Sequence, residues 1–101
     1  IQDAIRDLKT ARGQRVVGLK AGLTSRAKMQ QMGVEVPVFG VLFDYMQVAD
    51  GGDIAMNALI HPKVEAEIAF VLKTPLRGPG CTAAAVLAAT DYVVPAVEII
   101  D

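Results

Sequence analysis

The sequence is poor in the residues on which disulfides, zinc sites and nucleic-acid interfaces depend. Its 101 residues include one cysteine, Cys81, and one histidine, His61. A single cysteine cannot form an internal disulfide, which favours a reducing, cytoplasmic location. So few thiol and imidazole groups also argue against zinc. Charges of both signs are dispersed and sum to −1, whereas nucleic-acid binding needs a basic patch or stripe. No apolar run approaches the roughly 18 residues of a membrane helix. We therefore expect neither nucleic acid nor membrane as a partner.

Apolar residues, by contrast, are abundant. They make up 52% of the chain, a high share for one small domain. The chain starts at Ile1 and stops at Asp101, directly after the apolar run VVPAVEII. We expect residues 1–101 to form a single partial domain, a fragment of a longer catalytic domain. The apolar excess would then be surface that meets further chain or a partner.

The spacing of apolar residues and of Gly and Pro predicts a mixture of helices and strands. Helices are expected over 1–12, 25–32 and 82–89, strands over 15–23, 61–72 and 91–100, and loops over 49–53 and 74–81. Residues 34–46 are ambiguous, and a loop followed by a short strand or a helical turn is expected there. Because no regular βαβ alternation appears, the pattern favours an α+β fold.

Three glutamates stand in apolar strands. In HPKVEAEIAFVLK, residues 61–73, the alternation of a strand places Val64, Ala66, Ile68, Phe70 and Leu72 on one face. The other face carries Glu65 and Glu67, followed by Ala69 and Val71. In the last predicted strand, Glu98 shares a face with Val94, Ala96 and Ile100. Removing an ionised carboxylate from water costs several kcal/mol unless something compensates it, and neighbouring like charges add to that cost.

Solvent exposure, a basic partner or a shared cation could each compensate these carboxylates. Three carboxylates that converge from two strands suit a hard divalent ion such as Mg²⁺ or Mn²⁺. An E-x-E pair on a half-exposed strand is, however, most often solvated. The spacing alone therefore leaves both a solvated edge and a metal site open.

Four segments carry a resemblance to a known family: GLKAGLTSRAKMQQMGV, HPKVEAEIAFV, RGPGC and VLAATDYVVPAVEIID. In this order and spacing they resemble the hydratase/decarboxylase branch of the fumarylacetoacetate hydrolase superfamily. The resemblance runs from about Gly13 to Asp101. It implies a mixed β-sheet, or β-roll, of which this chain would hold the N-terminal to middle part.

The resemblance also implies the site residues. The metal ligands of the family fall on Glu65, Glu67 and Glu98, the same three residues that the burial argument selects. The active-site lysine of the G-x-K-x-G-L-T-S motif falls on Lys20, which the residues alone would also allow to be an exposed lysine. The implied cofactor is Mg²⁺ or Mn²⁺, with no other cofactor site.

Within the branch, LIHPKVEAEIAFV followed by PLRGPGC favours the enzymes that decarboxylate 2-oxohex-3-enedioate in the breakdown of aromatic compounds. Hydration of 2-oxopent-4-enoate is the close alternative. A second alternative, from another class, is a non-catalytic truncated fragment or assembly unit. The implied partners are a small 2-oxo acid as substrate and either a second copy of the chain or the sister hydratase.

Overall fold

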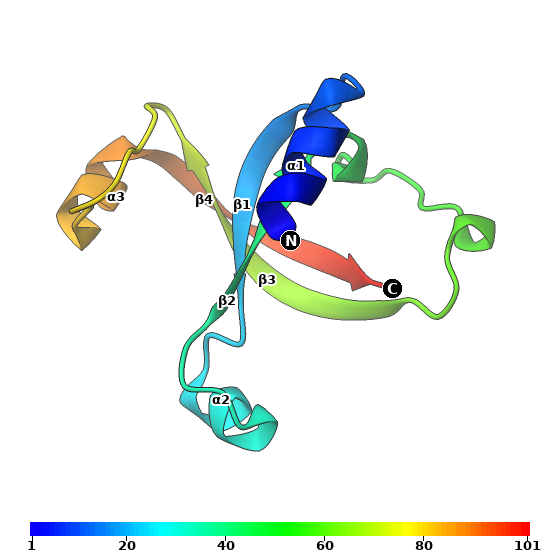
Figure 1. The fold of residues 1–101 in the computed structure, drawn as a ribbon, viewed down its shortest axis with the longest axis horizontal. Helices are drawn as coiled ribbons and strands as arrows, with labels where there is room; N and C mark the ends of the chain where they lie inside the picture. The colour runs from blue at the N-terminus through cyan, green and yellow to red at the C-terminus, as the bar shows by residue number, and fades with distance from the viewer. The chain divides into compact units, whose positions relative to one another are not determined.

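A computed structural model describes all 101 residues, Ile1 to Asp101, and confirms the α+β class. The chain divides into two compact units, Ile1–Ile54 and Ala55–Asp101, which we describe separately. Figure 1 shows the elements in chain order. They are α1 (Gln2–Ala11), β1 (Val16–Gly22), α2 (Arg26–Met32), β2 (Val38–Phe43), η1 (Asp44–Met46), η2 (Met56–Ala58), β3 (Lys63–Leu72), α3 (Ala83–Ala89) and β4 (Thr90–Ile100).

The first unit is built on the antiparallel pair of β1 and β2. The ambiguous segment 34–46 forms both candidate structures, because β2 is followed at once by the 3₁₀ turn η1. Helix α1 packs on this pair through Lys9, whose ammonium lies 5.3 Å from the ring centre of Phe43 and 4.7 Å from that of Tyr45. Phe43 is only 4% exposed and is the buried residue of this unit. The basic end of α1 therefore sits on a small aromatic cluster.

Residues at its two ends, Ser25 and Gly33, set the limits of helix α2. The Ser25 hydroxyl accepts a hydrogen bond from the backbone N–H of Lys28, at 3.1 Å. Gly33 ends the helix with φ of 66°, a left-handed conformation that glycine adopts at little cost. No residue of α2 is buried and Met32 is 62% exposed, because no second layer covers this helix in its unit.

The second unit is built on a long antiparallel pair, β3 and β4. The two strands are joined at one end through a loop and helix α3, which Thr82 caps by accepting from the backbone N–H of Ala85. Figure 1 shows α3 at this end of the curved pair and the C-terminus at the other. Cys81 lies in the loop and is exposed. Its thiol donates to the carbonyl of Arg77, at 3.1 Å.

Both strand pairs are two-stranded and antiparallel, and most apolar side chains lie at the surface. Phe43 and Ala89, each 4% exposed, are the only buried residues. None of the helices is long and apolar enough to cross a membrane. Apolar residues make up 52% of the chain, and most of their side chains are therefore exposed and available for contact with other protein surface.

Candidate metal centre

Strand pairing brings the three predicted glutamates together. The register of β3 and β4 places Glu65 directly opposite Glu98, and Glu67 opposite Ala96. Residues that face each other across an antiparallel ladder share one face of the sheet, as do residues two apart along a strand. One ligand oxygen from each glutamate lies within 4.8 Å of the other two. The sequence-predicted convergence is therefore present in the fold.

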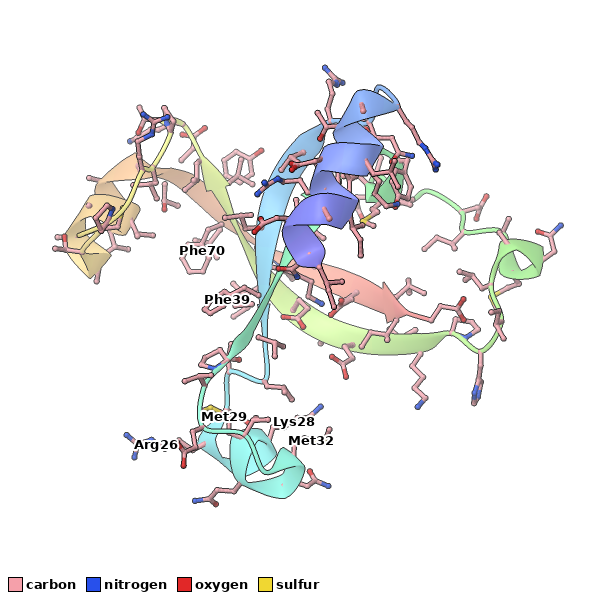
Figure 2. All side chains as sticks on the ribbon, in the orientation of Figure 1. Arg26, Lys28, Met29, Met32, Phe39 and Phe70 are labelled. Carbon is pink, nitrogen blue, oxygen red and sulfur yellow. The ribbon has the colours of Figure 1, made fainter.

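The face that carries these carboxylates is the more sheltered side of the sheet. We call Glu65, Glu67, Ala69 and Val71, with their cross-strand partners, the glutamate face. Glu65 on β3 and Glu98 on β4 are half-buried. On the opposite side Val64 and Ile68 are 71% and 70% exposed, and the Phe70 side chain extends outward from β3 (Figure 2). Partial shelter weakens hydration of the carboxylates, which favours a compensating cation.

The geometry of the three oxygens can be compared with what a divalent ion needs. Two ligands on opposite sides of one Mg²⁺ lie about 4.2 Å apart, twice the metal–oxygen distance, and for Ca²⁺ about 5 Å apart. The 4.8 Å limit falls between these values. Glutamate side chains have three rotatable torsions, which can bring their oxygens closer together around the smaller ion. The all-oxygen donor set and its spacing fit a hard divalent cation.

Lys20 lies in the first unit, at the middle of β1. It is half-buried and pairs with Gly40 of β2. A Cβ atom at position 40 would stand 3.2 Å from Cγ of Lys20, closer than nearly all ordinary contacts. The glycine therefore leaves room for the lysine stem to lie across the partner strand. Sequence reasoning identified Lys20 but not the role of Gly40, which becomes visible only once the two strands are paired.

Asp44 follows β2 and binds the start of β1. Its carboxylate accepts from the backbone N–H of Arg15, at 3.2 Å, and from the Arg15 guanidinium, at 3.3 Å. These bonds, the backbone one first, hold the pKa of Asp44 below its usual range, although partial desolvation acts in the opposite direction. Asp44 stands where β2 passes into the 3₁₀ turn η1. The structure shows a carboxylate that joins the ends of the two strands.

His61 and Asp101 meet at the end of the β3–β4 pair. The backbone N–H groups of Ile60 and His61 both donate to the Asp101 carboxylate. Sequence reasoning did not assign a role to Asp101. An available signal was the position of an acidic residue at the end of one strand, since its partner strand begins after Pro62, which has no N–H to donate.

Comparison with known proteins gives close relatives. The 4-oxalocrotonate decarboxylase of Pseudomonas sp. (strain CF600) is 62% identical over 101 residues, which are 100% of this chain and 38% of the relative. The 2-oxo-hept-4-ene-1,7-dioate hydratase of Escherichia coli is 49% identical over 94 residues, 93% of this chain and 35% of the relative. The chain is thus similar in sequence to both decarboxylases and hydratases. No model of a protein family matches it.

A solved structure shows the same similarity. The 4-oxalocrotonate decarboxylase from Pseudomonas putida G7, complexed with magnesium and adipate, superposes with a TM-score of 0.89 at 60% identity. The match covers 99% of this chain and 38% of that one. A second structure of the same enzyme is a complex with calcium and acetate. The chain thus spans well under half the length of the relatives that it matches.

Proposed function

We propose that the protein is a metal-dependent lyase that decarboxylates 2-oxohex-3-enedioate, also called 4-oxalocrotonate. The observation that carries this proposal is the convergence of Glu65, Glu67 and Glu98 on one sheltered sheet face. The convergence occurs in a chain that is 62% identical to a 4-oxalocrotonate decarboxylase.

In this proposal the three glutamates hold Mg²⁺, with Mn²⁺ as the alternative ion. The magnesium and calcium complexes of the related decarboxylase support a hard divalent ion. Three protein carboxylates leave positions on an octahedral ion for oxygens of the substrate. When bound, the ion supplies a Lewis acid where negative charge develops on the 2-oxo oxygen.

The reaction breaks the bond between C5 and the distal carboxylate of the substrate. Carbon dioxide leaves, and the electron pair remains at C5. It delocalises through the C3–C4 double bond onto the C2 carbonyl oxygen. The products are CO₂ and 2-hydroxypenta-2,4-dienoate, or its keto form 2-oxopent-4-enoate, after one proton is taken up. Adipate is a dicarboxylate of the same six-carbon length, so its presence in the related structure is in keeping with this substrate.

We propose Lys20 as the catalytic cation. An ammonium group can stabilise the developing enolate or the departing carboxylate, or donate the proton that completes the reaction. Its support is the G-x-K-x-G-L-T-S pattern and a half-buried position with space kept by Gly40. Lys20 lies in the first unit of the chain and the three glutamates lie in the second.

The rest of the expected architecture and setting belongs to the same proposal. In the longer family members, we expect the two antiparallel pairs to be part of a mixed sheet of the β-roll type. We expect a cytoplasmic enzyme that works as a homo-oligomer or with its sister hydratase. The large exposed apolar area supports further chain or a partner against this region.

The deciding experiment measures CO₂ release and substrate loss in the full-length protein. With 2-oxohex-3-enedioate and Mg²⁺ we expect CO₂ release to exceed hydration of 2-hydroxypenta-2,4-dienoate. Dominant hydration with no CO₂ would replace this proposal by the hydratase function, to which relatives such as the Escherichia coli protein point. If the protein shows neither activity and binds no metal, the remaining interpretation is the non-catalytic assembly unit.

A further inference from the structure

The glutamate cluster lies near the open end of the β3–β4 pair. The chain connects the two strands at the end where Leu72 pairs with Thr90, whereas Lys63 and Ile100 form the last pair at the other end. Glu65 and Glu98 face each other two positions inside this open end. At about 3.4 Å per residue, they are roughly 7 Å from it. The spacing of these two ligands therefore depends on the pairing at this end of the ladder.

Asp101 closes this end with its side chain. Its Oδ1 accepts from the backbone N–H of His61 at 2.6 Å and from that of Ile60 at 2.9 Å. Its Oδ2 accepts from the same N–H of Ile60 at 3.0 Å. One carboxylate thus receives two successive backbone N–H groups from a segment 40 positions away in sequence. Bonds to an ionised acceptor are about twice as strong as neutral ones.

The backbone alone could not make this connection at Pro62. Proline has no N–H, so the chain just before β3 cannot extend the ladder by donating from that position. The ladder ends at Lys63, and the Asp101 carboxylate bonds the two N–H groups on the far side of the proline. The side chain therefore continues the connection between the strands past the point where main-chain pairing stops.

We propose that Asp101 is a positioning residue for the metal centre. It keeps the open end paired, so that Glu65 and Glu98 stay at the spacing of a shared ion despite the repulsion between their carboxylates. Asp101 itself lies outside the cluster of ligand atoms, which consists of the three glutamates. This inference rests on the proposed metal function of that cluster. It adds a residue that acts through the backbone of Ile60 and His61.

The test is calorimetric titration of Mg²⁺ into the metal-free full-length protein. The variants are Asp101→Ala, which removes all three contacts, and Asp101→Asn, which keeps one acceptor oxygen but no charge. Asp91→Asn makes the matched control, since Asp91 is an exposed aspartate at the other end of β4. Loss of groups that orient metal ligands typically weakens metal binding 10- to 100-fold. We expect a loss in that range for Asp101→Ala, a smaller one for Asp101→Asn and none for Asp91→Asn.

Turnover at increasing Mg²⁺ gives a second readout that separates positioning from chemistry. The Mg²⁺ concentration for half-maximal turnover should rise by the same factor as the dissociation constant, while turnover at saturating Mg²⁺ recovers. Wild-type Mg²⁺ affinity in both Asp101 variants would overturn the inference. If Asp101→Ala does not fold, wild-type affinity in Asp101→Asn is sufficient to overturn it. Glu67→Gln distinguishes the two proposals: wild-type affinity there refutes the metal site itself.

Discussion

Replacing Glu67 by glutamine should change metal affinity and metal-free stability in opposite directions. The substitution keeps the shape of the side chain and removes one of three charges. Two unit charges at 4.8 Å, the outer limit of the cluster, repel by about 1 kcal/mol in water and by about 3.5 kcal/mol at an effective dielectric constant of 20. Glu67 takes part in two such pairs. Glu67→Gln should therefore relieve about 2 kcal/mol of repulsion even at the aqueous limit.

With metal present, the same change removes an attraction. Loss of one anionic ligand should weaken Mg²⁺ binding by at least about tenfold. A tenfold weaker affinity corresponds to a loss of about 1.4 kcal/mol in the free energy of Mg²⁺ binding. The ion stabilises the folded state to which it binds, so added Mg²⁺ should raise the unfolding temperature less in the variant than in wild type. Turnover should fall by orders of magnitude and recover in part at high Mg²⁺ or Mn²⁺.

The assay combines unfolding in chelator, unfolding in Mg²⁺ and calorimetric titration of Mg²⁺. Glu35→Gln is the control, because it makes the same chemical change at an exposed glutamate outside the cluster. We expect the control to match wild type in all three measurements. A Glu67→Gln protein with unchanged Mg²⁺ affinity and unchanged metal-free stability would mean that Glu67 is an ordinary solvated side chain. The metal-site assignment would then fail.

Three further outcomes follow from the first unit. Lys20→Met should leave Mg²⁺ affinity near wild type while slowing the chemical step. Calorimetry measures the affinity and single-turnover kinetics measure the chemical step. Equal losses in affinity and in rate would contradict the proposed role of Lys20. Gly40→Val should lower turnover by displacing the Lys20 stem, since even a Cβ would stand 3.2 Å from Cγ of Lys20, whereas Gly78→Ala, at a position with open space, should not. The depressed pKa of Asp44 contributes stability above its unfolded pKa that is lost as pH falls through the lower folded value. Acid unfolding followed by circular dichroism should therefore depend less on pH in Asp44→Asn, and identical acid profiles would count against the Arg15–Asp44 contact.

Local features of the fold were predictable because their causes lie within a few residues. Ser25 and Thr82 cap their helices through N–H groups three positions ahead, and Gly33 supplies the left-handed residue that ends α2. The alternation of a strand likewise assigned Glu65 and Glu67 to one face before any partner strand was known. The family resemblance pointed to the same glutamates, to Glu98 and to Lys20.

Other features depended on residues far apart in sequence, and only the tertiary structure decided them. Residues 38–43 follow Pro37 and contain Gly40, so their sequence does not clearly indicate a strand; they form one because β1 supplies the pairing. The register of β3 and β4 decided that Glu65 faces Glu98, since a shift of one residue would have put them on opposite faces. The same pairing carried Asp101 to the N–H groups of Ile60 and His61. The sequence determined which carboxylates could serve a metal, and the pairing of distant strands placed their oxygens within reach of one ion.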